Sequence, residues 1–395
     1  MYVEIHMIQN FAPSCLNRDD TNTPKDCEFG GCRRARISSQ CLKRAIRSQF
    51  SCDGLFGEKE LSVRTRLIVE KIARELGKLG KDEAKAKDAV MNALSSAKIS
   101  AGTDKKTQYM LFLSESEITS LTKLCIDHWD ALSSTVPAAE ESDESKGKKG
   151  KKKAAKDAVP PEVAKAVQKI FENSKAADLA LFGRMIADSK GFNVDGAAQV
   201  AHAFSTHKVS MEMDFYTAVD DLQPSEESGA GMMGNVGFNS ACFYRYSLVN
   251  LDLLYDNLKK DKNLAARTVD GFIKGSIIAI PTGKQNSMAA HNLPSMIMVV
   301  VREEGQPLSL ANAFAKPVHV IHSGDSDLVS DSILRMDSYF TNMVKVYGDS
   351  GIRQVGIVNA SDAKPEKGKK TEYESVEKLV KGVRGVVDAY LAAKN

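Results

Sequence analysis

Residues 206–250 restrict the fold of this chain more than any other segment. Polar and apolar side chains alternate in the first part, which is typical of a strand with one apolar side. That side would carry Val209, Met211, Met213 and Phe215. A glycine-rich stretch follows, and a second strand pattern begins at Phe238. The segment predicts a long β-hairpin, whose polar tip favours a protruding arm over the alternative of a buried meander.

Helical and extended patterns interleave along the rest of the chain. Residues 58–132 and 326–348 repeat apolar side chains at intervals of three and four, as amphipathic helices do. Residues 2–9 and 295–303 are rich in β-branched and apolar side chains, which is typical of strands. Because the hairpin requires antiparallel pairing, we predict the α+β fold class.

Length and composition narrow the class of protein further. A chain of 395 residues exceeds one ordinary hydrophobic core, so one large elaborated domain or two to three subdomains are expected. The sequence contains no apolar run of roughly 18 residues and no secretory signal pattern at its start. Its seven cysteines are odd in number and form no CxxC pair. We therefore predict a cytoplasmic protein with reduced thiols, no metal and no cofactor, with a zinc site as the alternative.

The segment from Arg33 to Arg47 concentrates charge that the net value of +3 hides. It holds six cationic side chains and no acidic one. Ser38 and Ser39 are suitable N-cap residues for a helix that opens at Gln40. One face of that helix would carry Gln40, Lys43, Arg44 and Arg47, and the opposite face Leu42, Ala45 and Ile46. The pattern predicts an apolar face on the core and a cationic face toward an extended polyanion.

Two further segments have unusual composition. Residues 11–39 are rich in turn-forming residues, so we predict a long functional loop that carries Arg18 and the pair Gly30–Gly31. The glycine pair permits a close approach of backbone to a ligand, and a surface turn is the alternative. Residues 138–158 have almost no large apolar side chain, and seven lysines lie between positions 146 and 156. This stretch is expected not to order by itself, either as a basic arm or as a solvated insertion.

Enzymatic motifs are absent from the sequence. It lacks GxxxxGK[ST], HExxH and GxSxG patterns. Two acidic pairs, Asp19–Asp20 and Asp220–Asp221, could hold Mg²⁺ for nucleic-acid cleavage, and turn contacts are the simpler interpretation. We therefore expect a protein without catalytic residues.

Several segments of the chain resemble a known family. The stretch LNRDDTNTPKDCEFGGCRRARISSQCLKRAIR at 16–47 is similar to the N-terminal signature of the CasC-type backbone subunit of the type I-E CRISPR Cascade complex. The resemblance continues, in order, through residues 181–187, 197–222, 242–254 and 307–314. The lysine-rich insert and the residues beyond about 360 depart from the family pattern.

The resemblance implies a hand-like architecture. It consists of a ferredoxin-like (RNA-recognition-type) palm, an inserted helical fingers domain and a protruding β-hairpin thumb. On this chain the implied bounds are palm 1–57, 184–205 and 246–360, fingers 58–183, thumb 206–245, and a C-terminal helical tail 361–395.

The resemblance also implies a function in antiviral defence. Subunits of this family stack head to tail along CRISPR RNA as a helical ribonucleoprotein filament and leave spacer bases free to pair with target DNA. The implied partners are CRISPR RNA, target DNA, other copies of the chain and Cascade subunits of the CasA, CasB, CasD and CasE types. Since guides differ in sequence, such a subunit must hold phosphate and ribose rather than read bases.

Residues with roles follow from the same resemblance. The guide would be contacted by Arg18, Ser38, Gln40, Lys43 and Arg44, and we add their neighbours Gly30, Gly31, Arg34, Arg36 and Arg47. Met185 would pack beside a base, and the thumb would displace a nucleotide and meet the next subunit through Phe215, Tyr216, Met232 and Met233. Related backbone subunits cut target RNA with a thumb-side aspartate, so a metal-dependent ribonuclease using Asp220 or Asp221 is the alternative. A sequence-specific DNA-binding regulator is a third.

Overall fold

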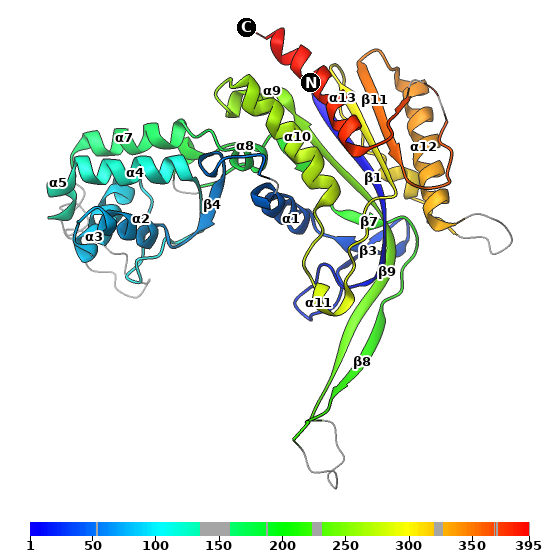
Figure 1. Ribbon diagram of the computed structural model, residues 1–395, viewed down its shortest axis with the longest axis horizontal. Helices are drawn as coiled ribbons and strands as arrows, with labels where there is room; N and C mark the ends of the chain where they lie inside the picture. The colour runs from blue at the N-terminus through cyan, green and yellow to red at the C-terminus, as the bar shows by residue number, and fades with distance from the viewer. Residues whose placement is uncertain are drawn as a thin grey trace. The chain divides into compact units, whose positions relative to one another are not determined.

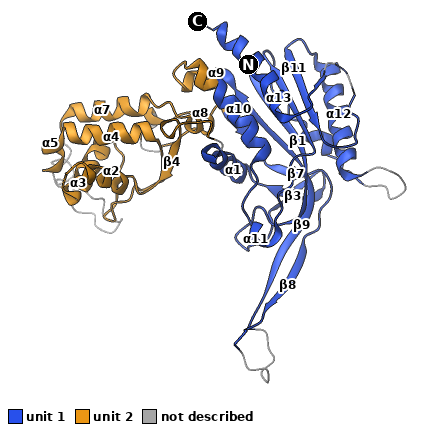
Figure 2. Ribbon diagram, in the orientation of Figure 1, with its two compact units in different colours: residues 1–53, 198–251, 266–395 blue, residues 54–197, 252–265 orange. Residues whose placement is uncertain are grey.

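The computed structural model describes residues 1–52, 54–134, 159–186, 189–222, 231–319, 327–366, 368 and 370–394. The chain forms two compact units (Figure 2). Unit 1 comprises Met1–Asp53, Ala198–Leu251 and Ala266–Asn395, and unit 2 comprises Gly54–Ala197 and Asp252–Ala265. The expected lysine-rich insert at 138–158 lies outside the described residues, as do residues 223–230 of the glycine-rich tip.

Unit 1 is built on one large mixed sheet with the strand order β12-β11-β10-β1-β9-β7-β3-β2 (Figure 1). At its centre β1 (Tyr2–Ser14) runs antiparallel to both β9 (Met232–Asn250) and β10 (Met296–Arg302). All residues of β10 are buried. A strand covered on both faces needs apolar side chains on both, which explains the unbroken apolar run of β10.

The remaining strands extend the sheet on both sides. They are β2 (Asp26–Phe29), β3 (Cys32–Ile37), β6 (Ala198–Val200), β7 (Ala203–Ser205), β11 (Ile352–Asn359) and β12 (Lys370–Glu372). β12 is parallel to β11, whereas the other described pairings are antiparallel. This mixed sheet with its helices confirms the α+β class. The ferredoxin-like description stays a prediction.

Helices cover both faces of the sheet in unit 1. On one face, α12 (Leu328–Tyr347) and the short η3 (Ala311–Phe314) pack on side chains of β10 and β11, including Val355 and Ile357. The residue between those two, Gly356, faces Leu379 of α13 on the other side. The alternation of side chains along β11 thus divides it between the two helices. The other helices of this unit are α1 (Ser39–Cys52), α11 (Gln285–Met288) and most of α10 (Lys262–Ile278).

The C-terminal residues belong to the body of unit 1. After β12 joins the sheet, α13 (Val376–Ala392) begins with the Ser375 side chain accepting a hydrogen bond from the backbone amide of Lys378. Its apolar stripe is buried through Leu379, Val380, Val383, Val387 and Leu391. The segment we predicted as a helical tail therefore contributes to the core.

A hairpin leaves the sheet where β9 passes beyond its neighbours (Figure 1). β8 (Glu212–Ala218) pairs antiparallel with the first residues of β9, from Met232 to Phe238. Every residue of β8 is exposed. The structure thus contains the hairpin expected from the alternating pattern, and the alternative of a buried meander is wrong.

Unit 2 is mainly helical. Its core is formed by α2 (Ile68–Lys78), α3 (Glu83–Ser96), α4 (Glu115–Asp127) and α7 (Pro161–Glu172). The shorter elements are η1 (Glu58–Glu60), α5 (Trp129–Ser133), α8 (Ala177–Phe182), η2 (Lys190–Phe192) and α9 (Leu251–Asn257). A two-stranded pair, β4 (Ser62–Thr65) and β5 (Leu111–Ser114), interrupts the helical pattern that the sequence predicted over 58–132. In the described parts of the chain, no helix has the length and apolarity needed to span a membrane.

Candidate nucleic-acid interface

Helix α1 is amphipathic in the predicted sense. Ser38 caps it, since its Oγ accepts a hydrogen bond of 3.3 Å from the backbone amide of Cys41. Leu42, Ile46 and Phe50 are buried beneath the helix. The opposite face carries Gln40 and Arg44, which are exposed, and Lys43 and Arg47, which are half-buried. Burial lowers the pKa of the Lys43 ammonium. The helix therefore holds a cationic row at the surface of unit 1.

Asn17 connects this helix to the loop that carries Arg18. The side-chain oxygen of Asn17 accepts a hydrogen bond of 2.8 Å from the backbone amide of Ser38. Its backbone oxygen accepts a second one, 2.9 Å long, from the amide of Lys25. The loop and the start of α1 are thus fixed to each other, a connection that sequence patterns did not reveal.

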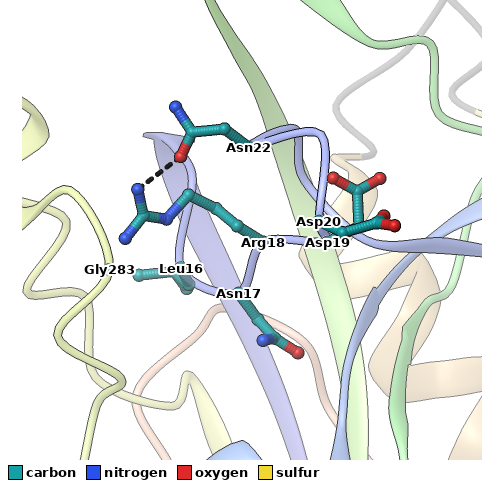
Figure 3. Close-up of a pocket in the computed structure, with 7 residues that line it drawn as sticks. All are labelled: Leu16, Asn17, Arg18, Asp19, Asp20, Asn22 and Gly283. Carbon is teal, nitrogen blue, oxygen red and sulfur yellow. Dashed lines mark hydrogen bonds between the residues drawn. The ribbon is translucent and has the colours of Figure 1, made fainter.

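Arg18 lines an open polar pocket of about 450 Å³. Its Nη1 donates a hydrogen bond of 2.5 Å to the side-chain oxygen of Asn22 (Figure 3). Asn22 has the left-handed φ of 68°, which asparagine tolerates better than most residues. The pocket is completed by Leu16, Asn17, Asp19, Asp20 and Gly283.

The carboxylate of Asp19 is engaged within its own turn. It accepts hydrogen bonds from the backbone amides and the hydroxyls of Thr21 and Thr23. These bonds, led by that from the Thr21 hydroxyl, hold the pKa of Asp19 below its usual range. In Figure 3 the two carboxylates of Asp19 and Asp20 extend away from the guanidinium of Arg18. The Arg18 guanidinium is therefore available to a phosphate at the pocket.

Gly30 and Gly31 form the turn between β2 and β3, which corrects the expectation of a continuous loop over 11–39. Their φ values of +64° and +73° are those of a two-residue hairpin turn that glycine favours. A Cβ on Gly30 would lie 1.7 Å from the backbone oxygen of Ala315. The turn is therefore packed at Gly30, and only Gly31 has open space around it.

Arg34 is fully buried, contrary to the expectation that it contacts a guide. Its guanidinium donates to three backbone oxygens, at 3.2 Å from Phe29, 3.0 Å from Ser205 and 2.8 Å from Phe314. Alternation along β3 separates Arg34 from the exposed Arg33 on the other side of the strand, whereas Arg36 shares the side of Arg34 and is half-buried. Arg34 is a structural residue of unit 1.

Arg36, near the end of β3, contacts His202, a residue beside the first turn of α1 that sequence reasoning missed. Arg36 Nε donates to the backbone oxygen of Asp26 at 3.0 Å, and its Nη1 lies 3.4 Å from His202 Nδ1. The same Nδ1 accepts a hydrogen bond of 3.2 Å from the Ser39 amide. Burial, followed by the charges of Arg36 and Lys25, lowers the pKa of His202. A neutral imidazole thus stabilises the first turn of α1.

Met185 belongs to unit 2 and is 83% exposed. Its neighbours Arg184 and Ile186 are both buried. The methionine is therefore presented on the surface of unit 2 by a buried backbone, as an apolar contact for a base would require.

The hairpin carries the other predicted apolar contacts. Their exposed fractions are 62% for Phe215, 39% for Tyr216, 55% for Met232 and 66% for Met233. Such a density of exposed large apolar side chains on one element marks an interaction surface.

The two aspartates proposed for cleavage lie beyond β8. Both Asp220 and Asp221 are exposed, and a side-chain oxygen of Asp220 accepts a hydrogen bond from the backbone amide of Leu222. Within the residues that the structure describes, no three His, Cys, Asp or Glu side chains gather as metal ligands.

One known family and two solved structures resemble this chain over most of its length. The sequence profile of a family described as "CT1975-like protein" matches residues 3–382. A chain from a solved structure described as "CRISPR RNA-guided surveillance complex, pre-nicking" is 29% identical, with a TM-score of 0.82, and the match covers 98% of this chain and 100% of that one. A chain from a second, described as "CRISPR RNA-guided surveillance complex", is 25% identical with a TM-score of 0.72 and the same coverage. No curated protein matches the sequence.

Proposed function

Because this chain belongs to the CT1975-like protein family, we propose that it is a crRNA-binding subunit of a CRISPR RNA-guided surveillance complex. Two solved structures described in those words match the chain over 98% of its length. At the finer level we propose the CasC-type backbone subunit of a type I-E complex, as the motifs at 16–47 and 181–187 indicate.

The observation that carries this proposal is the joined cationic surface of unit 1. Arg18 and the cationic face of α1 come from separate segments, and Asn17 ties them together through the amide of Ser38. Lys43 and Arg44 add charge next to the exposed amide of Gln40. Such cations and hydrogen-bond donors suit a ligand held by its phosphates, which is what guides of unrelated sequence require.

Assembly into a filament is the second part of the proposal. The exposed apolar residues of the hairpin, Phe215, Tyr216, Met232 and Met233, would contact the next copy of the chain and displace a base. Contacts of this head-to-tail kind do not close on themselves, so they extend along a linear RNA. The remaining spacer bases would then pair with target DNA, with CasA, CasB, CasD and CasE types as further partners.

We propose a non-catalytic role in this assembly. The protein holds the guide, and base pairing reads the target. Guide-bound protein, incubated with Mg²⁺ and complementary RNA, is expected to leave that RNA intact. Regularly spaced products that disappear in the Asp220→Ala variant or in the Asp221→Ala variant would instead establish the ribonuclease.

Electron microscopy of the purified chain with RNA tests the central claim. Mixed with single-stranded RNAs of two lengths and unrelated sequences, the protein should form filaments whose length follows the RNA. Affinity should be the same for the unrelated sequences. Binding to one sequence alone would favour the DNA-binding regulator or another specific reader, and the absence of any assembly on RNA would contradict the filament.

A further inference from the structure

Met185 is the most exposed large apolar side chain among the described residues of unit 2. The residues on either side of it are almost fully buried, Arg184 at 5% and Ile186 at 1% exposure. An unbranched methionine on a loose loop would sample many positions. Here, in contrast, the backbone that carries the side chain is fixed on both sides.

The backbone before Met185 is held by a pairing of Arg184 with Val194. Arg184 and Val194 exchange two backbone hydrogen bonds, of 2.9 and 2.8 Å. Before them Gly183 adopts a φ of +76°, and a Cβ there would lie 2.6 Å from the Val194 oxygen. The backbone before Met185 is therefore held in a conformation that glycine makes accessible.

The backbone after Met185 is held by the side chain of Asn193. Its oxygen accepts a hydrogen bond of 2.6 Å from the backbone amide of Ile186. Asn193 itself is exposed, so its side chain fills no space in the core. This bond therefore holds the backbone that follows Met185.

Beneath both lies the side chain of Arg184. Its guanidinium bonds to Glu117 Oε1 at 2.7 Å, to the Phe192 oxygen at 2.9 Å and to the Phe171 oxygen at 3.1 Å. It also lies 4.8 Å from the centroid of the Phe171 ring. Arg184 anchors the segment in the helical core, and Asn193 is the part of the arrangement that can be changed without opening that core.

We infer that Asn193 is a positioning residue, which holds Met185 in place for contact with a base of the bound RNA. The inference rests on the proposed RNA-binding function and adds a residue to it. A side chain ordered before binding loses less conformational freedom when the ligand arrives. Release of the Ile186 amide should therefore weaken the contact at one base, while the cationic surface of unit 1 is unaltered.

The test uses the full-length chain and single-stranded RNAs that carry one 2-aminopurine each, moved along the sequence. Wild-type protein should change the emission most at the position that Met185 contacts. Asn193→Ala should lose more than half of that change and bind about two- to tenfold more weakly. Asn193→Asp retains the accepting oxygen and should retain the emission change, whatever its added charge does to affinity. Met185→Ala should abolish the change.

Three results decide between the possibilities. If Met185→Ala abolishes the emission change but Asn193→Ala leaves it as in the wild type, the positioning role is wrong and the proposed function stands. If Met185→Ala leaves it unchanged while RNA is bound, the base contact itself is wrong, and the inference falls with it. Equal loss in Asn193→Ala and Asn193→Asp would also overturn the inference. Thermal melting of each variant identifies any that is unfolded.

Discussion

Two buried arginines of unit 1 have no carboxylate among the hydrogen-bond partners that the described residues provide. Arg34 is held by three backbone oxygens, and Arg245 donates to the side-chain oxygen of Gln9 at 2.5 Å and the backbone oxygen of Ser276 at 2.7 Å. Burial lowers the pKa of Arg245 to about 10, so it stays charged at neutral pH. Both charges therefore add to the positive potential of the unit that carries Arg18 and α1.

Lys43 and Arg44 of α1 should each neutralise one phosphate of the bound RNA. Replacing Lys43 or Arg44 with alanine should lower the slope of log affinity against log salt by about 0.7 on single-stranded RNA. Titrations at several salt concentrations measure this slope. The matched control is Lys345→Ala, an exposed lysine of α12 in the same unit, which should leave the slope unaltered. Equal effects at all three positions would mean that general charge, rather than α1, binds the RNA.

His6 gives a prediction about stability and pH. His6 is buried in β1, the strand between β9 and β10, and its Nδ1 lies 2.9 Å from the hydroxyl of Tyr244. Burial lowers the pKa of His6 to about 3. The unfolded chain, with a pKa near 6.5, binds the proton more readily, so stability falls as the pH drops below 6.5. The contribution of His6 between pH 7 and pH 5 is about 2 kcal/mol.

Urea unfolding of the wild type and of His6→Gln at both pH values isolates that contribution. The variant should lose less stability on acidification, because its side chain does not titrate. His202 and His207 also have lowered pKa values and act in the same direction in both proteins. Identical losses in wild type and variant would show that His6 does not supply the effect.

At the scale of elements, we expect substitutions in the hairpin to impair assembly without impairing RNA binding by one subunit. Serine at Phe215, Met232 and Met233 should abolish filaments, while the affinity of one subunit for a short RNA changes less than about twofold, or about 0.4 kcal/mol, because the cations of unit 1 are untouched. Light scattering and fluorescence anisotropy report the two quantities. Serine at Val346 and Tyr347, which are exposed at the end of α12, is the matched control and should leave filaments intact. Loss of both activities together would contradict the separate roles.

Helices and strands could be predicted where a regular pattern of apolar side chains extended over a long segment. The hairpin and α1 each combine a clear period with a local terminator, glycines in one and Ser38 in the other. The β2–β3 hairpin was missed because its strands are short and carry arginines, although its Gly30–Gly31 turn is a strong signal. The β4–β5 pair was missed because four-residue strands inside a helical stretch leave little period to detect.

At the scale of the whole molecule, the C-terminal residues should decide whether unit 1 folds. Ending the chain after Glu374 removes the five buried side chains of α13 and uncovers Gly356 and its neighbours on β11. Exposure of that much apolar surface should yield an insoluble chain or one without a cooperative thermal transition. Removal of residues 393–395 alone should leave melting unaltered. A soluble, cooperatively melting shorter chain would show that α13 is dispensable.

Long-range contacts set the limit of what the sequence could reveal about the site. The oxygens that hold Arg34 come from residues 171 and 280 positions away as well as from Phe29 nearby, so composition alone assigned its charge to the surface. Asn17 bonds to Ser38 across 21 positions for the same reason. The cationic face of α1 could be predicted without long-range contacts, because the helical period alone assigns Lys43, Arg44 and Arg47 to one face.

The continuity of β9 has a mechanical consequence. One strand of 19 residues serves both the projecting hairpin and the centre of the sheet, where it pairs with β1 from Tyr2 to Ser14. A pull along the arm is therefore transmitted to that ladder as shear, which loads its hydrogen bonds together instead of opening them one after another. The arm should yield at its own short pairing with β8 well before the sheet gives way, so that strain on an assembly is absorbed outside the core.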